Sequence, residues 1–149
     1  MPLPEFRSDG WLPGGHHPAT WDEIAARFGS APGSRRAAVL SDLLQWRAAV
    51  RAKGMGGRLI LDGSFISDKA APGDFDCIFV YNVTSFQTVS QDSEALLLLD
   101  NTHCKGRYGG DVWAFSEEAV REFPAFCRID GFDLHKLTRQ PKGVVEVDL

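Results

Sequence analysis

The segment from Gly63 to Tyr81 constrains the fold of this chain more than any other. A short apolar run at 58–62 leads into the Gly63-Ser64 pair, and two acids, Asp74 and Asp76, open a second apolar run that ends at Tyr81. A strand alternates its side chains between two faces, and beyond its acids this second run is apolar on both of them. The pattern therefore predicts two buried strands joined by a polar turn, with the second strand covered on both sides.

Asp74 and Asp76 are two residues apart, so in a strand they project to the same side with their Cα atoms about 6.6 Å apart. Two carboxylates placed in this way can bind the same Mg²⁺ ions, since Mg²⁺ prefers oxygen ligands. The alternative is a solvated strand start, because Asp commonly follows or caps turns. Gly63 and Ser64 favour the metal site, because glycine permits a close approach and the serine N–H and hydroxyl can bind phosphate oxygens.

The motif resembles the signature of the nucleotidyltransferase superfamily that includes DNA polymerase beta, in which a Gly-Ser turn precedes Asp-x-Asp by about ten positions. The chain is similar in particular to small bacterial nucleotidyltransferase-like proteins, which combine this core with an N-terminal Leu-Pro-x-Gly-x-His and Thr-Trp-x-Glu segment. The matching positions here are Gly63 to Asp76, Leu12 to His16 and Thr20 to Glu23. The likeness covers about residues 11–80 and is weak beyond them.

This resemblance implies that a nucleoside monophosphate is transferred from a nucleoside triphosphate to an acceptor hydroxyl, with Mg²⁺ or Mn²⁺ as cofactor and pyrophosphate as leaving group. Asp74 and Asp76 would bind the metal, and Gly63 and Ser64 would bind the nucleotide. Lys69, in the loop between them, matches a family position and could reach a phosphate, although a solvated lysine is an equally good interpretation.

A two-metal site usually needs a third carboxylate, which in this superfamily comes from a neighbouring strand. Asp111 is the best candidate, because it follows a Gly-Gly turn at the head of an apolar run, as Asp74 does after Pro72-Gly73. A turn-capping role for Asp111 is the alternative. Lys105, Arg107 and Lys142 are weaker candidates for contacts with the triphosphate or the acceptor.

The resemblance leaves the acceptor open between a protein, an RNA end and a small molecule. Small free-standing members of this superfamily often resemble antitoxins or defence components, so a role in a toxin–antitoxin or defence system is expected by analogy. The competing hypothesis is a non-catalytic nucleotidyltransferase-like module that binds a partner protein or a nucleotide. The short chain favours it, because few residues remain for an acceptor-binding domain, whereas the intact Ser64, Asp74 and Asp76 argue against it.

Composition narrows the partners and the compartment. A net charge of −4 gives no general attraction to polyanions, which argues against a long nucleic-acid duplex as substrate. No apolar run approaches the roughly 20 residues of a membrane span, and the first residues lack the pattern of a signal peptide, so a cytoplasmic protein is expected. Three cysteines without a Cys-x-x-Cys pair indicate reduced thiols.

The chain of 149 residues predicts one small α+β domain with a mixed sheet flanked by helices. An irregular Pro/Gly-rich arm over 1–19 precedes a nucleotidyltransferase-like domain over 20–149. Predicted helices begin at Thr20, Ser34 and Ser116, the first with the capping box Thr20/Glu23. Predicted strands cover 58–62, 75–81, 111–115 and 144–149, the last at an edge of the sheet. Residues 101–110 are predicted as a loop, 82–91 are left open between loop and strand, and 94–99 between helix and strand.

Overall fold

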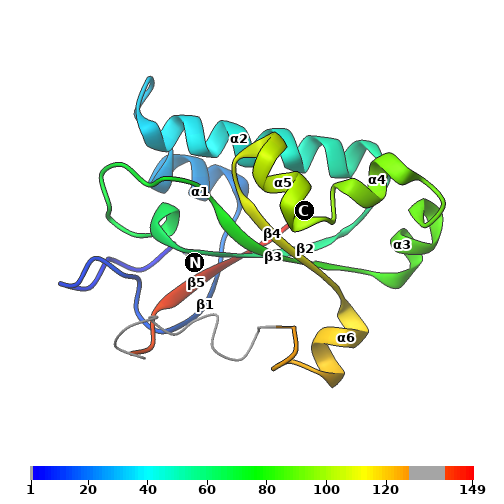
Figure 1. The fold of residues 1–149 in the computed structure, drawn as a ribbon. Coiled ribbons are helices and arrows are strands. Elements are labelled where there is room, and N and C mark those ends of the chain that lie inside the picture. Colours follow the sequence, from blue (N-terminus) through cyan, green and yellow to red (C-terminus); the bar gives the residue numbers. More distant parts are fainter. Residues whose placement is uncertain (1, 128–139) are drawn as a thin grey trace.

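The computed structural model describes residues 2–127 and 140–149 of the chain (Figure 1). Its strands are β1 (Gly15–Pro18), β2 (Gly57–Asp62), β3 (Asp76–Tyr81), β4 (Asp111–Ser116) and β5 (Gly143–Asp148). Its α-helices are α1 (Trp21–Phe28), α2 (Arg35–Ala52), α3 (Val83–Val89), α4 (Ser93–Leu97), α5 (Asn101–Tyr108) and α6 (Glu117–Glu122), and η1 (Ser64–Ile66) is a short 3-10 helix. The fold is α+β, as the sequence predicts.

The five strands form one mixed sheet in the order β1-β5-β2-β3-β4. Strand β2 is antiparallel to both of its neighbours, whereas β4 runs parallel to β3 and β1 runs parallel to β5. At one end of the sheet, therefore, β2 finishes while β3, β4 and β5 begin. That end of the sheet carries Asp62, Asp76 and Asp111.

Two hydrophobic cores cover the two faces of the sheet. The larger core joins Leu59, Leu61, Cys77 and Phe79 to helices α1 and α2, and the Trp46 ring of α2 meets the Phe79 ring edge-on at 5.5 Å. The smaller core lies on the opposite face, where α6 packs (Figure 1). It contains the buried residues Ile60, Ile78, Val80, Val120, Cys127 and Val144. Strand β3 is thus buried on both faces, which confirms the prediction from its apolar pattern.

The predicted helix starts are confirmed by their caps. Thr20 accepts a hydrogen bond from the Glu23 backbone N–H while the Glu23 carboxylate accepts one from the Thr20 N–H, which completes the capping box. Ser34 caps α2 and Ser116 caps α6. Each serine side-chain oxygen accepts a hydrogen bond from a backbone N–H in the first turn of its helix.

Two polar segments are helical where the sequence analysis did not predict a helix. Residues 82–91 contain α3, capped by Asn82, and residues 101–110 contain α5, capped by Asp100. Helix α5 ends at Gly109, whose φ of 74° is left-handed and favours glycine. Because Cys104 is the buried residue of this short helix, its sequence lacks the apolar stripe by which a helix is normally recognised.

The prediction that residues 144–149 form an edge strand is wrong. Strand β5 lies between β1 and β2, and the edge is β1, which belongs to the segment expected to be an irregular arm. Glu146 fits on an interior strand because its carboxylate is paired with Arg58 at 3.0 Å and with His16 at 2.8 Å. The acid that made the tail resemble an edge strand is therefore paired with Arg58 of β2 and hydrogen-bonded to His16 of β1.

The cysteines and the helices bear on the predictions made from composition. Cys77, Cys104 and Cys127 are buried free thiols, and burial raises the pKa of Cys104 to about 11. None of the helices in the described ranges is both long enough and apolar enough to cross a membrane.

We predict that Gly110→Ala destabilises the protein by about 1–3 kcal/mol, because overpacking of a filled core has this cost. An added Cβ at Gly110 would lie 2.2 Å from the buried Phe75 ring. Urea unfolding followed by circular dichroism measures the change.

Gly106→Ala is the matched control, since it lies in α5 and its added Cβ meets no described atom within 4 Å. Alanine favours a helix over glycine by about 1 kcal/mol, so this variant should be as stable as the wild type or more stable. Equal destabilisation by both substitutions would contradict the close packing of Gly110 against Phe75.

Candidate functional site

The strand register places three aspartates in a row across the sheet. Asp62 at the end of β2 is opposite Asp76 at the start of β3, and Asp76 is opposite Asp111 at the start of β4. Residues directly opposite each other on neighbouring strands project from the same face of the sheet. Because Ile60 and Ile78 face the smaller core, strand alternation puts Asp62 and Asp76 on that face as well. The row combines two predicted residues with Asp62, which the sequence analysis did not select.

Gly63 brings the predicted nucleotide-binding turn against this row. Its φ of 81° is in the region that favours glycine. A Cβ at this position would lie 3.4 Å from the Asp76 Cβ and 3.9 Å from its Oδ2, so the turn is in direct contact distance of this side chain. Ser64 follows directly and begins η1, half-buried beside the row.

Two arginines of α2 hold the loop that joins this turn to Asp74. Arg36 donates hydrogen bonds to the carbonyls of Phe65, at 2.6 Å, and of Ser67 and Lys69. Arg35 donates through Nε to the carbonyl of Pro72, at 3.1 Å, and also contacts that of Gly73. The loop backbone is therefore fixed at both ends, although its exposed Lys69 side chain lies outside these contacts.

The sequence analysis overlooked Arg35 and Arg36, although a signal was present. Basic residues in the first turn of a helix oppose the helix dipole, so two adjacent arginines after the Ser34 cap indicate a use other than helix stability. Burial lowers the pKa of Arg36, but a guanidinium remains charged at physiological pH.

Asp74 and Asp111 are brought together by a lysine from α5. The Lys105 ammonium donates to the Asp111 Oδ2 at 3.0 Å and also contacts the Asp74 Oδ2. The two carboxylates, Asp74 most of all, raise the pKa of Lys105. Asn101 donates to the other Asp111 oxygen, Oδ1, at 3.3 Å. Helix α5 thus contacts both oxygens of Asp111, and the Lys105 contact was not predicted from the sequence.

A second lysine neutralises Asp62. The Lys142 ammonium lies 2.5 Å from the Asp62 Oδ1, and the two side chains are only 7% and 6% exposed. The ammonium also lies 5.0 Å from the centre of the Trp11 ring, where a cation is attracted to the aromatic face. Lys142 therefore belongs to a buried ion pair beside the Gly63 turn, which gives it a structural role.

The remaining carboxylates have the chemistry of a Mg²⁺ site. Asp74, Asp76 and Asp111 are half-buried and offer the carboxylate oxygens that Mg²⁺ prefers. In residues 2–127 and 140–149, no three His, Cys, Asp or Glu side chains already stand together in the geometry of a metal site. The Lys105 ammonium instead lies between Asp74 and Asp111, so these two carboxylates already share a positive charge.

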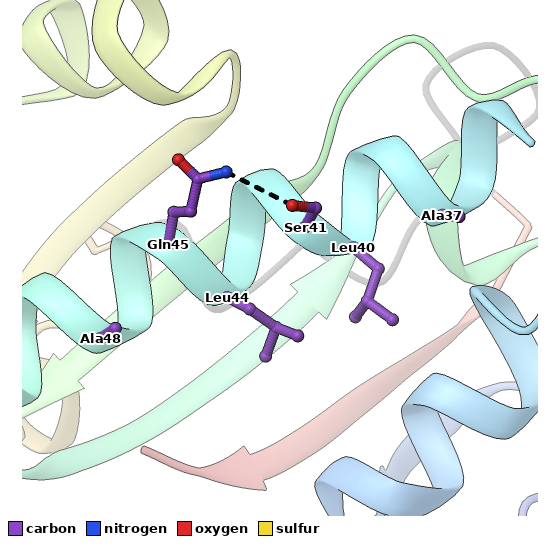
Figure 2. A pocket seen from close by; sticks show the side chains of 6 residues that line it. All are labelled: Ala37, Leu40, Ser41, Leu44, Gln45 and Ala48. Atoms are coloured by element: carbon purple, nitrogen blue, oxygen red, sulfur yellow. Dashed lines mark hydrogen bonds between the residues drawn. The ribbon is translucent and has the colours of Figure 1, made fainter. Parts of the chain in front are cut away.

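A separate hollow of about 370 Å³ lies on the outer face of α2 (Figure 2). It is shallow and mainly apolar, and its polar side chains Ser41 and Gln45 are hydrogen-bonded to each other at 3.3 Å. Its lining residues are Ala37, Leu40, Ser41, Leu44, Gln45 and Ala48. Without a charged group, this hollow offers no chemistry comparable to that of the aspartate row.

Comparison with protein families gives one match, to a family of unknown function, DUF6932, over residues 4–148. The chain belongs to the DUF6932 family. Neither the curated proteins nor the solved structures contain a significant match to it. Because the DUF6932 match begins at residue 4, the segment carrying Trp11 and β1 is part of the family unit together with the aspartate row.

We predict that the contributions of Asp62 and Lys142 to the stability of this DUF6932 protein depend strongly on each other. Asp62→Asn and Lys142→Met should each destabilise the protein by about 3–5 kcal/mol, because each removes one member of a buried ion pair. The double variant should lose much less than the sum of the two, as measured by urea unfolding.

Lys53→Met provides the control. Lys53 also contacts two acids, Asp92 at 3.0 Å and Glu94 at 3.1 Å, but these pairs are more exposed. The loss of Lys53 should therefore cost much less stability than the loss of either member of the buried pair, because solvent screens exposed ion pairs. Additive losses at positions 62 and 142 would contradict a coupled pair.

Proposed function

We propose that this DUF6932 protein is a nucleotidyltransferase that depends on Mg²⁺ or Mn²⁺. The observation that carries the proposal is the register that sets Asp76 opposite Asp111, with the Gly63-Ser64 turn directly against Asp76. A carboxylate row beside a turn with a left-handed glycine combines groups that can bind metal with backbone that can approach phosphates. The expected resemblance to the polymerase-beta-like superfamily supports the same assignment.

Asp74, Asp76 and Asp111 would hold the metal. When bound there, a divalent ion supplies positive charge that neutralises the triphosphate and lowers the pKa of an acceptor hydroxyl. The donor set fits this use because all three groups are carboxylates at one end of the sheet, and because two of them already share the Lys105 ammonium.

The triphosphate would lie along the Gly63-Ser64 turn. Gly63 has the positive φ that favours glycine and lets the backbone approach a ligand closely, and the Ser64 N–H and hydroxyl would bind phosphate oxygens. Arg35 and Arg36 position the following loop through its carbonyls, so they shape the site without binding the substrate. Lys69 is exposed at the rim of this loop, from which its long side chain can reach a phosphate.

The reaction is an in-line substitution at the α-phosphorus of a nucleoside triphosphate. The acceptor oxygen forms a bond to this phosphorus while the bond to the β-phosphate oxygen breaks, and pyrophosphate leaves. Asp111, as the third carboxylate, would help to activate the acceptor hydroxyl and take up its proton. The acceptor is a hydroxyl of a protein, an RNA end or a small molecule, and a partner protein within a toxin–antitoxin or defence system is the expected case by analogy.

A non-catalytic binding module is the second candidate. The observation that favours it is the Lys105 bridge, which satisfies Asp74 and Asp111 within the chain. In that case the row would be structural, and the protein would bind a partner protein or a nucleotide without turnover.

Labelling of a cell lysate distinguishes the two functions. The wild-type protein, given α-labelled nucleoside triphosphates and Mn²⁺, should transfer label to a specific acceptor. Asp76→Asn should reduce this labelling by about a hundredfold or more. Mutation of a residue that only supports a metal ligand already lowers metal affinity or activity by about 10–100-fold, and Asp76 would be a ligand itself.

Asp22→Asn, at an exposed position on α1, is the control and should label as the wild type does. If neither the wild type nor Asp76→Asn transfers label and both capture the same partner, the binding module replaces the enzyme.

A further inference from the structure

We infer that Lys105 is a resident cation of the site, which a divalent ion displaces and which then binds the phosphates of the incoming nucleotide. The inference rests on the proposed function and assigns it a further substrate-binding residue. Lys105 would thus have two alternative sets of partners, the carboxylates in the empty site and phosphate oxygens in the loaded one.

Helix α5 limits the positions that the Lys105 ammonium can reach. Asn101 and Lys105 are four residues apart, so they lie on the same side of the helix one turn from each other. Asn101 donates to the Asp111 Oδ1 and to the Val112 carbonyl, at 3.3 and 3.2 Å, which anchors α5 to the start of β4. The backbone of Lys105 therefore stays beside the site whether or not its ammonium contacts the carboxylates.

The ion pairs of Lys105 are exposed enough for its ammonium to leave the two carboxylates. Its side chain is 48% exposed, and those of Asp74 and Asp111 are 35% and 32% exposed, so each ion pair is weakened by solvent. Lys142 is the opposite case, because its pair with Asp62 is almost fully buried. Lys142 is thus fixed in the core, whereas Lys105 can leave its carboxylates.

A divalent ion and the Lys105 ammonium cannot occupy the same oxygens. The ammonium contacts the Oδ2 atoms of both Asp74 and Asp111, which are ligand atoms that Mg²⁺ would use. Once displaced, a lysine on a four-carbon stem remains within reach of an anion bound beside the same carboxylates. The displaced charge then compensates a triphosphate, and metal and nucleotide binding become coupled through Lys105.

The first test measures Mn²⁺ binding by calorimetry without nucleotide. Lys105→Met should bind Mn²⁺ about 2–30-fold more tightly than the wild type, which is the effect of removing two exposed ion pairs that compete with the metal. Arg107→Met is the matched control, because it removes one charge from the same helix, where the guanidinium lies over the Tyr108 ring. Its affinity should stay within about twofold of the wild type.

The second test measures binding of inorganic triphosphate to the Mn²⁺-saturated proteins, which makes the result independent of the base. Lys105→Met should bind this anion about tenfold more weakly, the usual effect of losing one charge-assisted hydrogen bond. Lys105→Gln, a polar alternative in case the methionine variant is unstable, should show the same two changes. Opposite changes in metal and triphosphate affinity are not expected from a residue that only stabilises the fold.

The outcomes separate this inference from the proposed function. If the wild type binds Mn²⁺ and Lys105→Met binds it equally or less tightly, Lys105 is no competing cation and the inference fails while the metal site stands. Unchanged triphosphate affinity in Lys105→Met overturns the phosphate role. If neither the wild type nor any of the variants binds Mn²⁺, the proposed function and the inference both fail.

Discussion

The pairing of β2, β3 and β4 in one register is the constraint on which the candidate site depends. It brings Asp62, Asp76 and Asp111, which are separated by many residues in the chain, to neighbouring positions on one face of the sheet. Because side chains alternate along a strand, a shift of the register by one residue would turn one of these acids to the opposite face. The two cores on either side of β3 hold that register, so the packing of the domain also sets the geometry of the carboxylates.

Gathering like charges in this way is unfavourable unless cations are nearby, and among the described residues Lys105 and Lys142 contact these acids. Lys142 is buried with Asp62, so this pair acts as part of the core. Lys105 is half-exposed between Asp74 and Asp111, where its charge is screened and can be replaced. Lys142 thus stabilises the fold, whereas the more exposed Lys105 belongs to the proposed functional site.

The sequence predicted the parts of the fold that depend on local patterns. The capping box at Thr20 and Glu23, the apolar run of β3 and the Gly-Ser turn are short-range signals, and the structure contains each of them. Helix α5 was missed because its cap and polar surface resemble a loop when Cys104 is its buried residue. The position of β5 was missed because the partners of Glu146 come from β1 and β2, which no local pattern reveals. The pairs Lys105–Asp74 and Lys142–Asp62 were missed for the same reason, since their members lie 31 and 80 residues apart in the chain.

The most direct test of the account is a crystal structure of the protein grown with Mn²⁺ and a non-hydrolysable nucleoside triphosphate, using the anomalous signal of manganese to locate the ion. The account predicts an anomalous peak within bonding distance of the carboxylates of Asp74, Asp76 and Asp111, with the phosphates along the Gly63-Ser64 turn. Nucleotide bound elsewhere, or a structure with saturating Mn²⁺ and no peak at these carboxylates, would contradict it.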